Sequence, residues 1–169
     1  MKVIVDAAYV FRAMNGFRMQ SGEGELEFAD YNKLFAELSA LAEEGDEISY
    51  HVYVTEYAWK RAGKFLYALK QLGAVTKSKM VRGTRSRDRD VRDNWDVGIA
   101  VDLTVMATMG GERDFVIVAG SAALSPALEW LRTLTARVTM AGFEGSIAGT
   151  LLAVPGVEVC VLDPERLKL

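Results

Sequence analysis

Hydrophobic positions along the chain follow two different spacings, which alternate from the N-terminus to the C-terminus. Short runs rich in Val, Ile, Tyr and Phe predict strands over residues 2–6, 49–57, 75–81, 114–120, 137–142 and 157–162. Longer segments with apolar residues three or four positions apart predict helices over residues 30–43, 59–72, 96–109, 125–135 and 146–152. The remaining segment, residues 7–28, is rich in Gly and Glu and predicts a helical turn followed by a loop.

This alternation of strands and helices predicts a single-domain α/β fold over residues 1–169. The expected architecture is a three-layer α/β/α sandwich in which a mainly parallel sheet is covered by helices on both faces. In sheets of this kind, ligands bind beyond the carboxyl ends of the strands. Asp6, Ser121 and Gly142 follow or end predicted strands, so we expect all three at that edge.

Composition limits the classes of function. The net charge of −3 and the pI near 5.3 exclude a protein that coats DNA by general electrostatic attraction. A single cysteine, Cys160, excludes an internal disulfide and a multi-cysteine zinc site, and favours a reducing, cytoplasmic location. The first residues predict a strand rather than a signal peptide, and no apolar run reaches the roughly 20 residues of a membrane span.

Three carboxylates are candidates for chemistry. Asp6 ends the first predicted strand, and Asp96 and Asp102 belong to the helix predicted from residue 96. Carboxylates that converge beside strand ends predict a site for a divalent metal ion, Mg²⁺ or Mn²⁺, of the kind that cleaves phosphodiesters. Asp96 and Asp102 are six residues apart, about 120° around a helix, so they can share a site only if Asp96 begins the helix. The alternative is that Asp96 is only an N-cap and that Asp102 pairs with a buried arginine.

A basic segment directly precedes that helix. Residues 77–92 carry seven cations and two aspartates, which gives a local charge of +5. The cations are Lys77, Lys79, Arg82, Arg85, Arg87, Arg89 and Arg92. Placed along the mouth of the acidic site, they predict sequence-independent contacts to the phosphates of a nucleic acid, with RNA as the expected partner. The alternative is a solvated loop in which arginines and aspartates pair with one another.

The order of these motifs resembles the NYN domain, a branch of the PIN-like nucleases, over nearly the full chain. The resemblance rests on a strand ending in Asp, on Trp-Asp-Val-(x)3-Val-Asp at residues 95–102, on Ala-Gly-Ser-Ala-Ala-Leu-Ser-Pro at residues 119–126, and on the closing segments 141–143 and 146–151. It implies a Mg²⁺- or Mn²⁺-dependent ribonuclease. Asp6 matches the first metal-binding aspartate, Asp96 the aspartate that opens the helix, and Asp102 the second helix carboxylate, with Asp6 and Asp96 as the metal ligands.

The sequence departs from the family pattern at three positions. Tyr9 stands where the family has an asparagine, and Ser121 and Ala123 stand where it has two aspartates. Ser121 can hold a metal ion or its water only weakly, and the lost negative charge lowers metal affinity. We therefore expect a slow ribonuclease that uses Asp6, Asp96, Asp102 and Ser121. The alternative is a catalytically inactive NYN-like module that binds RNA or a protein partner, and the apolar last strand also allows a homodimer.

Overall fold

The computed structural model describes residues 1–21, 27–57, 62–81 and 94–169, apart from the side chains of residues 17–21 and 57. Within this part of the chain, six strands form one sheet in the order β3-β2-β1-β4-β5-β6, and every neighbouring pair is parallel. The strands are β1 (Lys2–Asp6), β2 (Ser49–Tyr57), β3 (Val75–Val81), β4 (Asp114–Val118), β5 (Arg137–Phe143) and β6 (Val157–Leu162). The prediction of a mainly parallel sheet is therefore confirmed.

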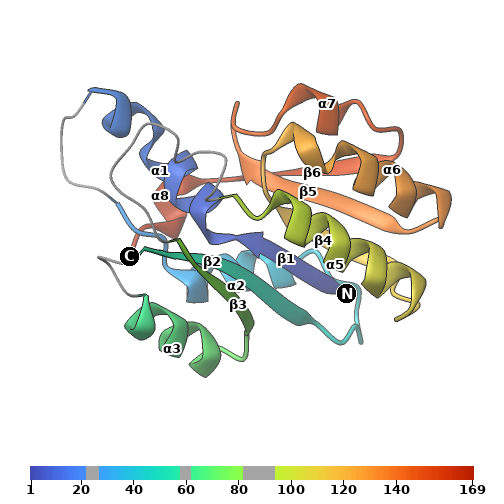
Figure 1. The fold of residues 1–169 in the computed structure, drawn as a ribbon, viewed down its shortest axis with the longest axis horizontal. Coiled ribbons are helices and arrows are strands. Elements are labelled where there is room, and N and C mark those ends of the chain that lie inside the picture. The colour runs from blue at the N-terminus through green and yellow to red at the C-terminus, as the bar shows by residue number, and fades with distance from the viewer. Residues whose placement is uncertain (22–26, 58–61, 82–93) are drawn as a thin grey trace.

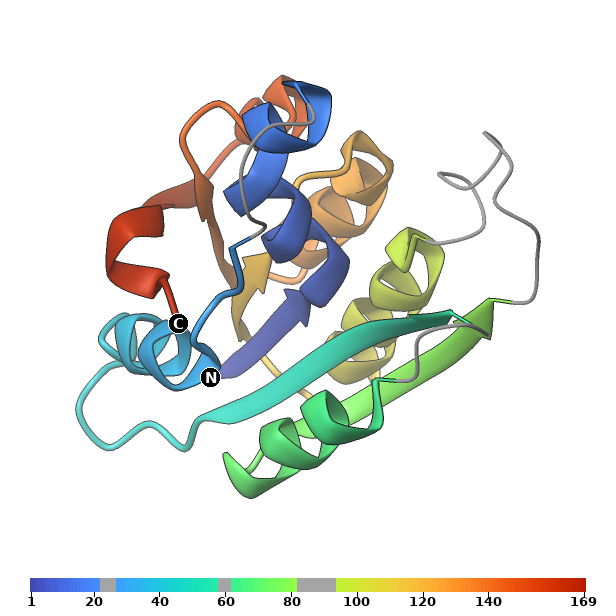
Figure 2. The same cartoon turned by 90° about the vertical axis from the view of Figure 1, so that its left-hand side faces the viewer.

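Helices cover both faces of the sheet, as Figures 1 and 2 show. On one face lie α1 (Ala7–Ser21), α2 (Tyr31–Ser39), α3 (Gly63–Gln71) and α8 (Pro164–Leu167). On the other lie α5 (Asp96–Thr108), the short 3-10 helix η1 (Ala122–Leu124), α6 (Ser125–Thr133) and α7 (Gly149–Leu152). The predicted three-layer α/β/α architecture is confirmed.

The chain builds the sheet outward from its centre in two directions. The strands β1, β2 and β3 lie side by side in one direction, and the chain then returns to the other side of β1 to form β4, β5 and β6. The connections leave β1 and β4 in opposite directions, so the boundary between these two strands is the topological switch point of the sheet. Ligands of open parallel sheets bind beyond the carboxyl ends of the strands at such a point.

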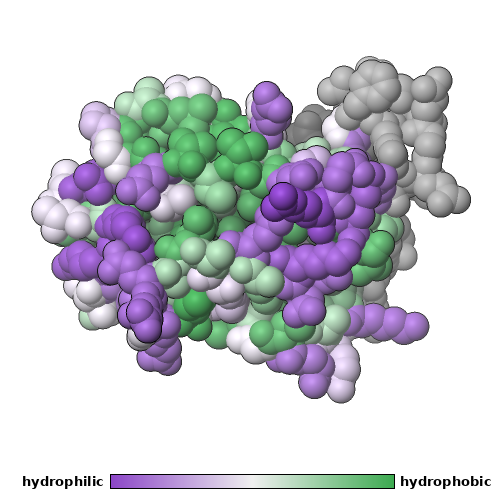
Figure 3. Space-filling model, turned by 180° about the vertical axis from the view of Figure 1, so that it is seen from behind, coloured by the Kyte–Doolittle hydropathy of each residue, from purple (hydrophilic) through white to green (hydrophobic). Residues whose placement is uncertain are grey.

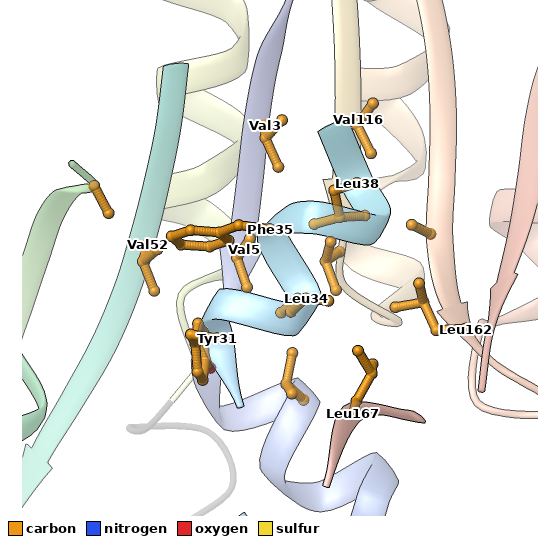
Figure 4. Packing of buried hydrophobic residues seen from close by; sticks show 14 of the residues in the cluster. Val3, Val5, Tyr31, Leu34, Phe35, Leu38, Val52, Val116, Leu162 and Leu167 are labelled. Carbon is orange, nitrogen blue, oxygen red and sulfur yellow. The ribbon is translucent and has the colours of Figure 1, made fainter. Parts of the chain in front are cut away.

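Two apolar layers hold the helices against the sheet. In the layer shown in Figure 4, one face of α2 supplies Leu34 and Leu38, which pack over Val3 and Val116 of the central strands. In the opposite layer α5 contributes Ile99, Leu103 and Ala107, spaced four residues apart and fully buried. Because β1 and β4 are buried on both faces, their sequences are continuous β-branched and apolar runs rather than alternating ones.

Several element boundaries differ from the predictions. The helix α1 is far longer than the predicted single turn. At its start the Asp6 side chain accepts a hydrogen bond from the backbone N–H of Ala8. Further along, the buried Asn15 side chain donates hydrogen bonds to the carbonyls of Phe11 and Glu27. The helix α2 ends at Ser39 rather than at residue 43, and α6 ends at residue 133 rather than at residue 135. The helix α7 begins at Gly149 rather than at residue 146. The helix α8 was not predicted, and the predicted start of α3 lies outside the described residues.

The outer surface carries both apolar and charged regions. From behind, hydrophobic side chains gather in one part of the surface and hydrophilic side chains in another (Figure 3). The exposed apolar residues include Val97, Val101 and Met109 on α5 and Val159 and Val161 on the edge strand β6. Among the described residues, no helix has the length and apolar character required to cross a bilayer.

Candidate functional site

Three chain segments meet at the carboxyl edge of the sheet, beside the switch point. The strand β1 ends at Asp6, and α1 begins at the next residue. The helix α5 begins at Asp96 near this junction, as Figure 1 shows, and Ser121 lies just beyond the end of the neighbouring strand β4. The structure thus brings together three of the four side chains that the sequence indicated as catalytic.

Asp6 is almost completely withdrawn from water, with only 3% of its surface exposed. One of its carboxylate oxygens, Oδ1, accepts a hydrogen bond of 2.9 Å from the backbone N–H of Ala8. Burial raises the pKa of Asp6 above its usual range, and the negative charge of Asp96 acts in the same direction. The charge of Arg12 and the backbone N–H groups at the start of α1 lower this pKa without cancelling the effect of burial.

Asp96 is the first residue of α5 and is 6% exposed. Its Oδ2 accepts a 2.6 Å hydrogen bond from the Ser121 hydroxyl and a 3.0 Å hydrogen bond from the Asn94 side-chain amide. A carboxylate at this position is also stabilised by the partial positive charge of the helix N-terminus. Ser121 therefore serves as a hydrogen-bond donor to Asp96 at the position where the family pattern has a further carboxylate.

The pair of Asp6 and Asp96 fits one hard divalent cation. Both side chains offer carboxylate oxygens, and a bound cation would offset the loss of hydration that chiefly raises the pKa of Asp6, together with the smaller effect of the Asp96 charge. Magnesium is commonly held by one or two carboxylates, with water and substrate phosphate completing its coordination. However, the described part of the chain contains no cluster of three or more His, Cys, Asp or Glu residues that could hold a metal. Among the described residues, this pair would therefore offer a metal ion two acidic ligands and no more.

Asp102 lies in a different environment from the one predicted. It accepts hydrogen bonds from the Tyr53 hydroxyl and, at 2.5 Å, from the Lys77 ammonium group. Although its partial burial acts to raise the pKa of Asp102, these two hydrogen bonds and the charges of Lys77 and His51 together outweigh that effect, and the pKa is lowered. Because residues 96 and 102 point in different directions around α5, Asp102 faces β2 and β3, and none of its contacts within the described residues is with Asp6 or Asp96. Its partner is a lysine, not the arginine of the alternative prediction.

The two lysines of the predicted nucleic-acid surface are on β3. Lys77 pairs with Asp102, and Lys79 donates a hydrogen bond to the Asn94 carbonyl while its ammonium group lies 4.9 Å from the centre of the Trp95 ring. Both lysines thus connect β3 to α5, and Lys79 does so next to the acidic pair. The other five cations of this prediction, Arg82, Arg85, Arg87, Arg89 and Arg92, lie outside the described residues.

Tyr9 closes one side of the site. Its hydroxyl and that of Ser146 are 2.6 Å apart, and both lie within hydrogen-bond distance of the backbone N–H of Phe143. A Cβ atom on Gly120 would lie 2.6 Å from Cε2 of the Tyr9 ring, and one on Gly142 would collide with the Tyr9 hydroxyl. The Tyr9 side chain therefore fills the space beside the two glycines at the carboxyl ends of β4 and β5.

Sequence analysis did not identify Arg12 as part of this region. Its Nη2 atom lies 3.9 Å from Oδ2 of Asp6, and about half of its side chain, 49%, is exposed. The sequence pattern does not indicate Arg12, because it predicts only one helical turn and a loop for residues 7–28. A continuous α1 places Arg12 one to two turns beyond Asp6, within reach of the site.

A parallel α/β sheet with paired carboxylates at its switch point is the arrangement expected of a PIN-like nuclease. A family model of the NYN domain matches residues 1–156, and the chain belongs to the NYN domain family, a branch of the PIN-like nucleases. Members of this family generally bind RNA and use divalent metal ions.

Comparison with solved structures supports the fold. A crystal structure of a protein of unknown function from Vibrio parahaemolyticus is similar, with a TM-score of 0.74 and 20% sequence identity. The match covers 99% of this chain and 94% of that one. A search of the curated proteins gave no significant match.

Proposed function

We propose that this NYN domain is a metal-dependent ribonuclease with a reduced acidic site, in which Asp6 and Asp96 hold one Mg²⁺ or Mn²⁺ ion. The observation that carries the proposal is the burial of two carboxylates at one edge of the sheet beside the switch point, Asp6 at the end of β1 with 3% and Asp96 at the start of α5 with 6% of its surface exposed. A fold gains nothing in stability from such a pair, because each buried charge loses hydration and repels its neighbour. Pairs of this kind are typical of functional sites.

The residues of the chain act mainly by positioning. Asp6 is oriented by the backbone at the start of α1, and Asp96 by Ser121 and Asn94, so neither carboxylate has to be ordered when a cation binds. When bound, the divalent ion supplies Lewis-acid polarisation of the phosphate that is attacked. The serine at position 121 keeps Asp96 in place but contributes no charge, so we expect weak metal affinity and slow turnover.

A second candidate function has support of its own. Asp96 already accepts a hydrogen bond from Ser121, and the charge of Arg12 lies 3.9 Å from Asp6, so the two carboxylates are partly stabilised without metal. This favours a catalytically inactive NYN module that binds RNA or a protein partner through the same edge of the sheet. The two candidates differ in their dependence on a metal ion.

Cleavage and binding can be measured together with end-labelled single-stranded RNA and millimolar Mn²⁺. For the ribonuclease we expect slow cleavage that stops with a chelator and falls at least about tenfold in Asp96→Asn, because the mutation removes half of the acidic ligand set. The asparagine can still accept the hydrogen bonds from Ser121 and Asn94, so the fold should survive the change. Cleavage that persists in Asp96→Asn would identify a contaminating nuclease. A gel shift without cleavage, unaffected by chelator, would support the inactive module instead.

Restoring the missing charge provides an independent test. We expect Ser121→Asp to increase both Mn²⁺ affinity and RNA cleavage about tenfold or more, because a third carboxylate strengthens the attraction for a hard cation. The matched control is Ser121→Asn, which changes the size of the side chain in a similar way without adding charge. Equal rates for the two variants would show that lack of charge at position 121 is not what limits the reaction.

A further inference from the structure

Arg12 is poorly placed to be only a counterion for Asp6. The closest approach between the two side chains is 3.9 Å, beyond hydrogen-bond distance, and the guanidinium makes no hydrogen bond to any described residue. A structural partner of a buried carboxylate would be expected at about 2.7–2.9 Å, with its donors engaged. Instead, about half of the Arg12 side chain is exposed to solvent.

The charge at the site depends on whether metal is bound. Asp6 and Asp96 contribute −2 and Arg12 contributes +1, a sum of −1 for these three side chains, while Lys79 places a further ammonium group beside the start of α5. Without metal the two carboxylates oppose the approach of an RNA phosphodiester, which is itself singly negative. A divalent cation on the carboxylate pair changes the sum to +1. The site then attracts a phosphate, and Arg12 no longer needs to neutralise Asp6.

We propose that Arg12 binds the RNA phosphate beside the Asp6–Asp96 pair when a divalent cation occupies that pair. This inference rests on the proposed function and names the residue that contacts the substrate. The planar guanidinium presents parallel N–H donors that match two phosphate oxygens, which a lysine ammonium group does not reproduce. Arg12 is on α1, so the phosphate is held between the helix that follows β1 and the carboxylates.

This role predicts opposite effects on two ligands. Replacing Arg12 with glutamine removes a positive charge beside Asp6, so Mn²⁺ binding should become about two- to fivefold tighter. The same change removes the phosphate contact, so single-stranded RNA should bind at least about tenfold more weakly in the presence of Mn²⁺. A residue that only stabilised Asp6 would not weaken RNA binding while strengthening metal binding.

The experiment measures Mn²⁺ affinity by electron paramagnetic resonance of the free ion, and RNA affinity by gel shift in Mn²⁺ at 4 °C. The variants are Arg12→Gln, Arg12→Lys and Arg166→Gln. The last removes the same charge from an exposed arginine of α8 that pairs with Asp163 in its own turn. We expect Arg12→Lys to keep the wild-type Mn²⁺ affinity with intermediate RNA affinity, and Arg166→Gln to match the wild type in both.

The outcomes separate this inference from the function on which it rests. Wild-type RNA affinity in Arg12→Gln, with metal binding intact in both proteins, would overturn the role of Arg12 and leave the ribonuclease proposal standing. Weaker Mn²⁺ binding in Arg12→Gln would also overturn it, since Arg12 would then support the geometry of Asp6. A wild-type protein that binds neither Mn²⁺ nor RNA would overturn both proposals.

Discussion

At the scale of single residues, Asp6 illustrates the conflict between a stable fold and an acidic site. The carboxylate is buried, and its charge is opposed both by the lack of water and by Asp96. Because the folded state raises the pKa of Asp6 above its value in the unfolded chain, folding favours the protonated form. In metal-free protein the stability therefore decreases as the pH rises from the unfolded pKa through the folded one, and the loss persists at neutral pH.

We predict that Asp6→Asn raises the melting temperature of metal-free protein at pH 7 by about 2–4 °C. The asparagine oxygen can still accept the Ala8 N–H, and the variant does not carry the buried charge. The melting curves of the two proteins should converge in acid, where Asp6 is protonated. Mn²⁺ should stabilise the wild type and not the variant. Thermal unfolding in chelator and in Mn²⁺ measures all three effects, and a less stable Asp6→Asn at pH 7 would contradict the argument.

The sequence predicted which candidate side chains lie at one edge of the sheet better than it predicted their contacts. Asp6, Asp96 and Ser121 could be found because each adjoins a strand end or a helix start, and such positions converge in a parallel sheet. The location of Asp102 could not be fixed, since helical spacing gives its direction around α5 but not which strands face it. Arg12 was missed because the glycine at position 16 suggested an early end to a helix that long-range contacts of Asn15 stabilise.

At the scale of elements, α5 and the strands β2 and β3 are joined by polar contacts in addition to apolar packing. The fully buried Tyr53 donates to Asp102, and Lys77 reaches the same carboxylate from β3. A parallel sheet predicts that a helix covers this face, but not that a polar cluster fills the margin between the helix and the edge strand. The pair of Asp102 and Lys77 is partly exposed, so its contribution to stability is modest.

We predict that Asp102→Asn and Lys77→Met each lower the free energy of unfolding at pH 7 by about 0.5–1 kcal/mol. The double variant should cost less than the sum of the two, since both changes break one interaction. Because the folded state lowers the pKa of Asp102, its stabilisation is present at neutral pH and is lost only as the pH falls through that lowered value. Urea unfolding at pH 7 and in acid measures this, with Lys64→Met on α3 as the exposed control.

The same variants separate the structural and catalytic interpretations of Asp102. If Asp102 only connects α5 to β3, Mn²⁺ affinity in Asp102→Asn should equal that of the wild type. A clear loss of Mn²⁺ affinity in a folded Asp102→Asn protein would assign the residue to the metal site after all.

At the scale of the whole molecule, the strand order explains why the site is where it is. The alternation of elements predicted a parallel sheet with helices on both faces, because local periodicity distinguishes the two kinds of element. It did not give the order β3-β2-β1-β4-β5-β6, which depends on which side of β1 the returning chain packs. That return makes β1 and β4 neighbours and brings residues 6 and 121 to one edge, although more than one hundred residues separate them in the chain.

The space that Tyr9 occupies also constrains how this sequence can evolve. A methyl group at position 120 or 142 would overlap the Tyr9 side chain, so both positions require glycine while Tyr9 is present. The Tyr9 and Ser146 hydroxyls both accept a hydrogen bond from the backbone N–H of Phe143. A mutation at any one of these positions is therefore tolerated only in certain backgrounds. An asparagine at position 9 would not fill the space of the tyrosine ring, and an alanine at position 142 requires the loss of Tyr9 together with a shift of the Ile147 side chain, which its Cβ would approach to 2.8 Å. Changes at position 9 and at the two glycines beside it are thus coupled, so that their effects on stability should not add.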